Sequence, residues 1–328
     1  MHSLGWVSYR ARHLTLRSAL AAVKLTKIYR IGLARRNVVA LDDLTFDVGE
    51  GQLFGLVGPN GAGKSTAIKL LLGLIRPTSG TGSIDGHPIG TPESRQRLGF
   101  LPENPALYEF LTAQEYLSLS GSLLKLDKKT IKTRSAELLE RVGLTHAADL
   151  GIRKFSKGMV QRLGLAQALM GDPAVVILDE PMSGLDPIGR KDVRDIMFRL
   201  RDEGRTVFFS THILPDVEAI CDRVALLSKG KLTDIGKLDD LLSNRVKAVE
   251  VTVSGLPSEE LEKLKRERSA RVQSDGHLIA SFPTQDEAQA FLSEAMKLSG
   301  KVEQVNAVRE NLEDLFMRRA AEAHEARK

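Results

Sequence analysis

A glycine-rich loop with a lysine follows a short apolar run near residue 55. Residues 58–66 read Gly-Pro-Asn-Gly-Ala-Gly-Lys-Ser-Thr, which matches G-x-x-x-x-G-K-[ST] between a predicted strand, 53–57, and a predicted helix from 67 onward. Loop amides and the helix N-terminus donate to a phosphate, and glycines without a Cβ allow a close approach. The sequence therefore predicts a nucleoside triphosphate site. Its residues are Gly58, Asn60, Gly61, Gly63, Lys64, Ser65 and Thr66, with Lys64 facing the outer phosphates and Ser65 holding Mg²⁺.

Two carboxylates end a second apolar run. Residues 175–181 read Val-Val-Ile-Leu-Asp-Glu-Pro, which predicts a buried strand of a parallel sheet. Its carboxyl end should lie beside the phosphate loop, because open α/β sheets place their ligands at that edge. We therefore expect Asp179 to hold Mg²⁺ and Glu180 to act as the general base on the attacking water.

A histidine ends a third predicted strand, residues 205–212. A lone histidine is usually structural, but His212 is predicted to lie at the same sheet edge as Asp179. We therefore interpret it as a contact to the γ-phosphate.

Ser156 and Gly158 open a predicted amphipathic helix in the segment Phe-Ser-Lys-Gly-Met-Val-Gln-Arg, residues 155–162. Ser156 is a plausible N-cap, and a helix N-terminus with a free hydroxyl is also an anion site. From the residue types alone, an ordinary capped helix and a phosphate contact both remain open.

This segment resembles the signature motif of ATP-binding cassette (ABC) ATPases, L-S-G-G-Q-x-Q-R. Five motifs occur in the order typical of that family, over about residues 22–240. The resemblance implies that Ser156 and Gly158 contact phosphate and that Asp186, in Ser-Gly-Leu-Asp-Pro, faces a partner subunit. Glu103 stands where most members have the Q-loop glutamine, which implies a place near Mg²⁺. Tyr29 stands where members stack an aromatic ring on adenine, although a core tyrosine is the alternative.

Two departures from the family pattern point to a subfamily. Lys157 and Met159 replace the usual glycine and glutamine of the signature, and Glu103 replaces the glutamine. Both changes resemble the ATPases that drive ABC-2-type exporters.

In the family, two cassettes close head-to-tail over two ATP molecules. One cassette per chain therefore implies a homodimer, and ATP hydrolysis that powers a polytopic membrane permease on a separate chain. The expected location is cytoplasmic, peripheral on the membrane's cytoplasmic face. One alternative is a soluble, non-transport ABC ATPase acting on ribosomes or DNA. Another is a nucleotide-binding scaffold without turnover, against which the intact Lys64, Asp179, Glu180 and His212 argue.

The charge distribution bears on the partners. The net charge is +5, but residues 1–40 hold eight Lys or Arg and no Asp or Glu, so the remainder is slightly acidic. A nucleic-acid partner is therefore not expected. We interpret residues 1–21 as a basic, disordered extension; a transit peptide or contact with anionic lipid are the alternatives. No stretch has the roughly 20 apolar residues that a membrane span needs. The single cysteine, Cys221, excludes an intrachain disulfide.

These elements predict an α/β fold with two domains. Residues 22–240 form a P-loop ABC ATPase domain, with a mixed core sheet and a helical subdomain at about 104–165. Residues 245–322 form an α+β accessory domain. Strand and helix patterns there follow the order βαββαβ, including a helix from Pro257 to Leu264, which predicts a small ferredoxin-like fold.

Overall fold

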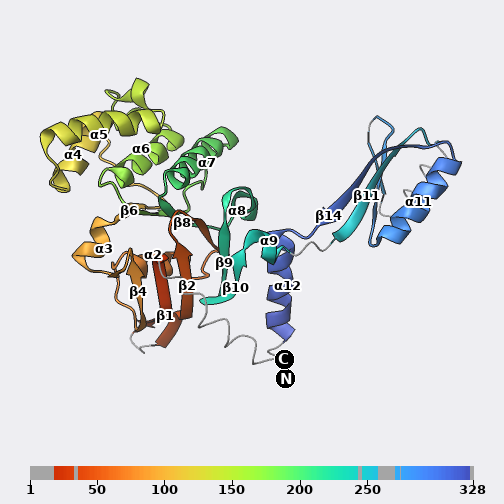
Figure 1. Cartoon of the computed structure of the whole chain (residues 1–328), viewed down its shortest axis with the longest axis horizontal. Helices are drawn as coiled ribbons and strands as arrows, with labels where there is room; N and C mark the ends of the chain where they lie inside the picture. The colour runs from red at the N-terminus through yellow and green to blue at the C-terminus, as the bar shows by residue number, and fades with distance from the viewer. Residues whose placement is uncertain (1–17, 33–35, 243–245, 258–269, 274, 326–328) are drawn as a thin grey trace. The chain divides into compact units, whose positions relative to one another are not determined.

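The computed structural model describes residues 18–32, 36–242, 246–257, 270–273 and 275–325 (Figure 1). The chain divides into two compact units, Met1–Leu238 and Asp239–Lys328. The predicted helix from Pro257 to Leu264, apart from Pro257 itself, lies outside the described residues, as does the predicted extension up to residue 17.

The first unit contains the larger number of elements. They are β1 (Ser18–Ile31), β2 (Arg36–Gly49), β3 (Leu53–Val57), α2 (Lys64–Leu71), β4 (Ser79–Ile84), β5 (His87–Pro88), α3 (Pro92–Gln96), β6 (Leu98–Leu101), α4 (Ala113–Leu123), α5 (Lys128–Arg141), the 3₁₀ turns Thr145–Ala147 and Ile152–Lys154, α6 (Lys157–Leu169), β7 (Val175–Asp179), α7 (Pro187–Asp202), β8 (Thr206–Thr211), α8 (Leu214–Ile220), β9 (Arg223–Ser228) and β10 (Lys231–Lys237). Helix α9 (Leu238–Leu241) spans the division between the units.

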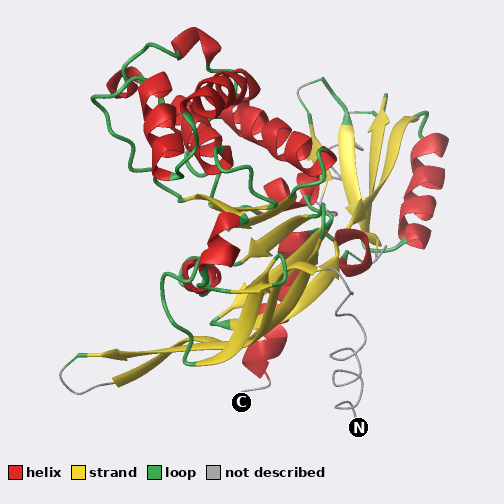
Figure 2. Cartoon of the chain, turned by 60° about the vertical axis from the view of Figure 1, so that its left-hand side comes forward, coloured by secondary structure: helices red, strands yellow, loops and turns green. Residues whose placement is uncertain are grey.

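A six-stranded sheet forms the centre of the first unit, in the order β10-β9-β3-β8-β7-β6 (Figure 2). All neighbours pair in parallel except the edge strand β10, which is antiparallel to β9. Every residue of β3 and β8 is buried, as expected for parallel strands covered on both faces. The carboxyl ends of β3, β8 and β7 therefore meet at one edge, as predicted.

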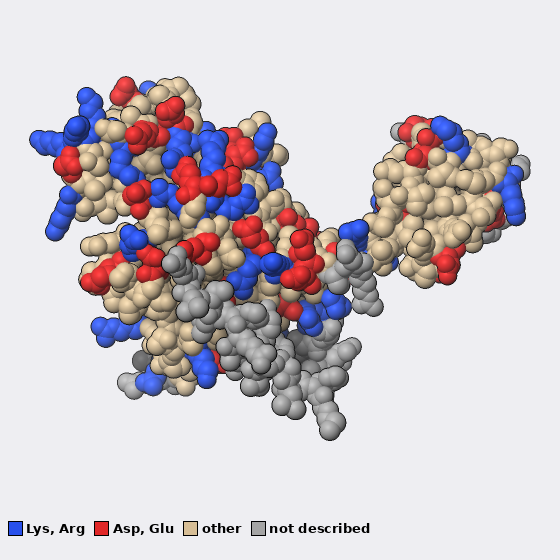
Figure 3. Space-filling view, viewed as in Figure 1, with Lys and Arg blue, Asp and Glu red and all other residues tan. Residues whose placement is uncertain are grey.

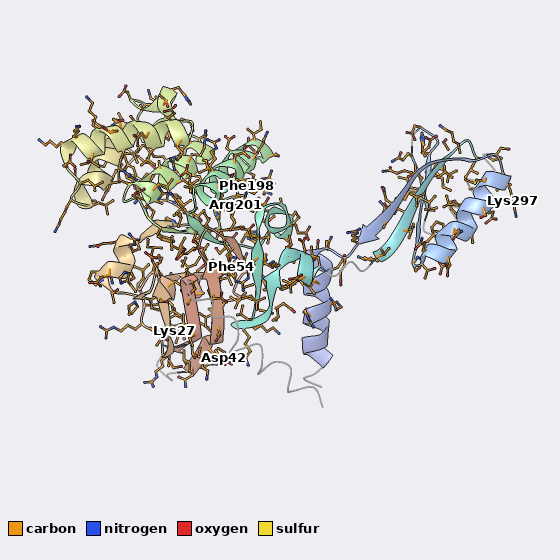
Figure 4. All side chains as sticks on the ribbon, viewed as in Figure 1. Lys27, Asp42, Phe54, Phe198, Arg201 and Lys297 are labelled. Carbon is orange, nitrogen blue, oxygen red and sulfur yellow. The ribbon has the colours of Figure 1, made fainter. Side chains whose placement is uncertain are left out.

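A second sheet, in the order β2-β1-β4-β5, is antiparallel and packs on the first. Phe46 of β2 stacks on Phe54 of β3 and Phe208 of β8, with ring centroids 5.6 and 5.8 Å apart, which joins the two sheets in one apolar core. Figure 4 labels Phe54 within this layer.

Strand β1 corrects the predicted boundary of the N-terminal extension. It begins at Ser18, so residues 18–21 belong to the fold rather than to a disordered extension ending at 21. Ala19, Leu20 and Ala21 are buried, because β1 pairs with β2 on one side and β4 on the other. Three small or apolar side chains in a central strand bury surface that a free extension could not.

Helices α4, α5 and α6 pack together as a helical region beside the sheet (Figure 1). Thr112 and Glu115 form a capping box on α4, Asp127 caps α5, and Ser156 caps α6. Basic and acidic side chains alternate over the face of this region seen in Figure 3. One ion-pair cluster ties α5 to the sheet: Asp172 accepts from Arg205 at 2.7 Å and from Arg134 at 3.3 Å.

The second unit contains β11 (Val246–Ser254), β12 (Ala270–Val272), β13 (Leu278–Phe282), α11 (Gln285–Lys297), β14 (Lys301–Arg309) and α12 (Leu312–Glu325). Its antiparallel sheet has the order β12-β13-β11-β14, the arrangement of a ferredoxin-like fold. Helix α11 packs on this sheet, with Phe291 4.9 Å from Phe282 between ring centroids. The predicted fold class is therefore confirmed for the described elements.

Among the described residues, no helix is long and apolar enough to cross a membrane.

Candidate functional site

The glycine-rich loop connects the end of β3 to the start of α2, as predicted. Gly63 is the N-cap of α2, with φ 113°. At Gly58 the backbone passes so close to β9 that a Cβ would clash with the carbonyl oxygen of Leu227. The close approach of a phosphate is one reason for a glycine at this position. The structure adds a second reason, which is close packing of the loop on its own neighbouring strand.

Lys64 is the first residue of α2, and its side chain turns back under the loop. Its Nζ donates to the carbonyl oxygen of Gly58 at 2.7 Å and lies 3.2 Å from Oε1 of Glu180. The side chain is only 6% exposed. A buried ammonium is stable only with such partners, so these contacts place a positive charge at the base of the loop.

Glu180 follows the last residue of β7 and adopts a left-handed conformation, with φ 46°. This unusual conformation in a non-glycine residue is held by hydrogen bonds from its amide to Oγ and the carbonyl oxygen of Ser210, at 3.1 and 3.2 Å. The turn directs its carboxylate toward the loop: Oε1 faces Lys64, and Oε2 lies 2.9 Å from Nδ1 of His212. Glu180 therefore joins the lysine and the histidine in one contact chain.

Asp179 ends β7 beside Glu180 but has a different environment. Its Oδ1 accepts from Oγ of Ser210 at 2.6 Å. Burial, and then the neighbouring Glu180 charge, raise the pKa of Asp179 above its ordinary value, against the lowering effect of the Ser210 hydrogen bond. A cation beside this carboxylate would relieve the same penalty.

Lys64, Glu180 and His212 line a cleft of about 640 Å³. Of the residues predicted from the sequence, the cleft brings together Asn60, Gly61, Gly63, Lys64, Ser65, Thr66, Glu103, Glu180 and His212. Gly58 and Asp179 do not line the cleft. The carbonyl oxygen of Gly58 accepts from Lys64, which does line it, and Asp179, hydrogen-bonded to Ser210, directly precedes the lining residue Glu180. The loop, the carboxylates and the histidine therefore lie in one place, although they are far apart in the chain.

Other lining residues were not predicted as part of the site. They are Val38, Val39 and Ala40 of β2, together with Pro59, Ala62, Ser183, Lys229 and Gly230. Lys229 and Gly230 form the turn between β9 and β10, and the amide of Gly230 donates to the carbonyl oxygen of Ala62 at 2.8 Å. A Lys-Gly turn between two short strands is a common sequence pattern, so nothing local marked it as part of a site.

Tyr29 is not among the residues that line the cleft. It lies in β1 opposite Val38, which does line the cleft, and the Nζ of Lys27 stands 5.2 Å from its ring centroid. Stacking of Tyr29 on adenine thus stays a prediction.

The signature residues and Asp186 also lie outside this cleft. Ser156 caps α6, its Oγ accepting from the amide of Met159 at 3.3 Å, and a Cβ on Gly158 would meet nothing within 4 Å. Asp186 caps α7, accepting from the amide of Gly189 at 2.8 Å. The N-termini of α6 and α7 are therefore both capped, but neither lines the cleft of its own chain.

A parallel sheet with this loop, lysine, carboxylate pair and histidine at one edge defines a P-loop nucleoside triphosphatase. Among the described residues, no group of three or more His, Cys, Asp or Glu forms a ready-made metal centre.

Comparison with known proteins gives the family. Residues 41–183 match the model of the family described as ABC transporter. An uncharacterised ABC transporter ATP-binding protein of Synechocystis sp. is 43% identical over 91% of this chain and 84% of its own length. The bacitracin transport ATP-binding protein BcrA of Bacillus licheniformis is 39% identical over 71% of this chain and 75% of its own.

Solved structures with a similar fold lead to the same family. One described as the ATP binding subunit of an ABC transporter has 34% identity and a TM-score of 0.60, covering 68% of this chain and 92% of its own. The cassette MJ0796 in a dimeric post-hydrolysis state with ADP and Pi has 25% identity and a TM-score of 0.60, covering 67% and 98%.

This chain belongs to the ABC transporter ATP-binding subunits. It binds and hydrolyses ATP as the motor of a transporter, and the soluble ABC ATPase acting on ribosomes or DNA is set aside.

Proposed function

We propose that two copies of this chain close head-to-tail over two ATP molecules and that Glu180 is the general base for hydrolysis. The observation that carries the proposal is the contact chain Lys64–Glu180–His212 at the edge where the phosphate loop lies. A bound phosphate competes with Glu180 for Lys64. That exchange leaves Oε1 of Glu180 available to accept a proton from water, while Oε2 stays with His212. His212 is 42% exposed, and its Nε2, the ring nitrogen that does not face Glu180, is the atom that we propose contacts the γ-phosphate.

Mg²⁺ fits the oxygen donors at this edge, namely the hydroxyl of Ser65 and the carboxylates of Asp179 and Glu103. When bound, it neutralises charge on the outer phosphates. Ser65 and Glu103 line the cleft, and the raised pKa of Asp179 reflects a carboxylate that a cation would stabilise.

The second copy is proposed to supply the N-terminus of α6, with Ser156 and Gly158, and to meet Asp186. Both lie outside their own chain's cleft, and the Ser156 hydroxyl and the open space at Gly158 leave room for a phosphate there. The two-fold arrangement then completes each site from two chains.

The direction of transport and the membrane partner are inferred from the relatives of this chain. Two relatives are named for bacitracin transport and linearmycin resistance, and the signature Ser-Lys-Gly-Met resembles ABC-2-type exporters. We infer an exporter whose permease is a separate polytopic chain, with this subunit on the cytoplasmic face of the membrane. Tyr108 and Phe110, 52% and 82% exposed, are candidate anchors for that permease.

The test is the molar mass of Glu180→Gln in solution with and without Mg-ATP. Glutamine keeps the shape but not the basicity, so ATP stays bound and the dimer accumulates. The matched control adds Lys64→Ala to the same variant; it should not shift, because the charge that faces the phosphates is gone. A Glu180→Gln protein that hydrolyses ATP at the normal rate would remove Glu180 from its role.

A further inference from the structure

The loop of residues 183–186, here called the D-loop, begins in the nucleotide cleft. Ser183 lines the cleft, and its amide donates to the carbonyl oxygen of Glu180 at 3.0 Å. The loop ends at Asp186, the cap of α7. The D-loop is thus hydrogen-bonded at one end to the proposed catalytic base, Glu180, and continues at the other end into helix α7.

Arg190, in the first turns of α7, holds the middle of the D-loop. Its Nε donates to the carbonyl oxygen of Leu185 at 3.2 Å. The other end of the guanidinium faces α8, where Nη1 lies 3.9 Å from Oδ2 of Asp216. One side chain therefore contacts both the loop and the helix that follows His212.

Asp216 is a buried carboxylate with no role in the site described above. Its side chain is 6% exposed, and Oδ2 has no hydrogen-bond partner among the residues that the structure describes. A second guanidinium, Arg194, stands 3.8 Å from Oδ1. A buried charge needs compensation, and here it comes from two arginines that both stand beyond hydrogen-bond distance.

These contacts close a ring. Asp216 lies four residues after His212, and His212 contacts the carboxylate of Glu180. From Glu180 the path runs through Ser183 to Leu185, then to Arg190 and back to Asp216. A shift of the segment that carries His212 therefore changes the distance between Asp216 and the side chain that holds the D-loop.

We propose that Arg190, oriented by Asp216, is a positioning residue that sets the D-loop relative to the Glu180–His212 pair. This inference rests on the proposed function, in which that pair hydrolyses ATP and the D-loop meets the second copy. It gives the buried Asp216 a role in transmitting the state of one nucleotide site to the surface that the other copy contacts.

Arg194 provides a matched control. It lies on the same helix, faces the same carboxylate, and is 31% exposed against 34% for Arg190, but no hydrogen bond links it to the D-loop among the described residues. Arg190→Met and Arg194→Met therefore remove equal charge beside Asp216, and only the first removes the loop contact.

The experiment compares Arg190→Met, Asp216→Asn and Arg194→Met in the full chain. Amide hydrogen exchange over residues 183–189, without nucleotide, should be about tenfold faster in the first two and unchanged in Arg194→Met. The turnover number should fall about tenfold in the first two, while the affinity for fluorescent mant-ATP stays within about twofold. The double variant of Arg190 and Asp216 should be no worse than Arg190→Met, because both act through one contact.

Loop exchange in Arg190→Met that matches the wild type would overturn the proposal. So would an equal effect of Arg194→Met, which would indicate a purely structural ion pair. If Asp216→Asn does not fold, the two arginine variants decide alone. A wild-type protein without ATP turnover would instead count against the proposed function, and the exchange comparison would still decide the contact.

Discussion

At the residue scale, the site depends on side chains whose partners are distant in sequence. Glu180 is the clearest case: its left-handed backbone and its two carboxylate contacts arise from Ser210, His212 and Lys64. Neighbouring carboxylates consequently have different environments. Asp179 is hydrogen-bonded and desolvated, whereas Glu180 is ion-paired, and this difference suits the roles of metal ligand and general base that we propose for them.

Replacing Asp179 by asparagine should stabilise the nucleotide-free protein at pH 8 while removing Mg-dependent hydrolysis. The pKa of Asp179 is raised in the folded state, chiefly by burial, so its ionisation costs stability above that pKa. The penalty is absent below the ordinary carboxyl pKa of about 4. The gain in melting temperature should therefore be complete at pH 8 and shrink as the pH falls toward that value, which calorimetry across pH would measure.

Asp172→Asn is the control, because its expected effect on stability is opposite to that of Asp179→Asn. Hydrogen bonding to Arg205, aided by the charges of Arg205 and Arg134, lowers the pKa of Asp172 in the folded protein. The ionised carboxylate therefore stabilises the fold above the ordinary carboxyl pKa, and this stabilisation is lost as the pH falls through the lowered pKa. This variant should be less stable than the wild type at pH 8, by a small margin because Asp172 is 60% exposed. Equal behaviour of the two variants would contradict the assigned environments.

At the scale of elements, parallel pairing assembles the site. Strands β3, β8 and β7 are adjacent, with Val57 opposite Thr211 and Asp179 opposite Ser210, so the residues that follow each strand reach one edge. The phosphate loop is in turn seated on β9 through Gly58. The N-termini of helices α6 and α7 lie outside the cleft of their own chain.

Gly58→Ala should destabilise the nucleotide-free protein by about 1–3 kcal/mol, because the added methyl meets backbone that cannot move without shifting β9. Gly158→Ala is the matched change at the other predicted phosphate contact. Its Cβ meets nothing, so its stability should be unchanged or about 0.5 kcal/mol higher from helix propensity. Urea unfolding compares the two, and a Gly58→Ala protein as stable as the wild type would show that the loop is not packed as described.

At the scale of the whole molecule, the chain has two units with separate cores. Phe46, Phe54 and Phe208 belong to the first core, and Phe282 and Phe291 to the second. Because these aromatic side chains pack in two separate clusters, the energetics of one unit need not follow those of the other. Thermal unfolding of the full chain is expected to show more than one transition.

Phe291→Ala tests this separation. The ring is 1% exposed, so truncation should cost the second unit about 3–5 kcal/mol while the mant-ATP affinity of the first stays unchanged. Met296→Ala, on the same helix and 62% exposed, should change neither. If Phe291→Ala weakened nucleotide binding, the two units would be coupled.

The residues of the nucleotide site could be predicted from the sequence, because the loop 58–66, the Asp-Glu pair and His212 each combine characteristic residue types with an apolar strand. These are local signals, and the meeting of the three segments follows from them because parallel strands end at the same edge of a sheet. The ferredoxin-like unit was likewise predictable from alternation and capping patterns, as its sheet order confirms.

Only the tertiary structure decided which partners these side chains have. Packing between β1 and its two neighbours extended the fold to Ser18, and contact with β9 explained Gly58. The turn Lys229-Gly230 entered the cleft, and Asp216 became buried between two arginines of another helix. The physical reason is the same in each case: burial and electrostatic pairing depend on groups brought together across the chain, and no local pattern of residues carries that information.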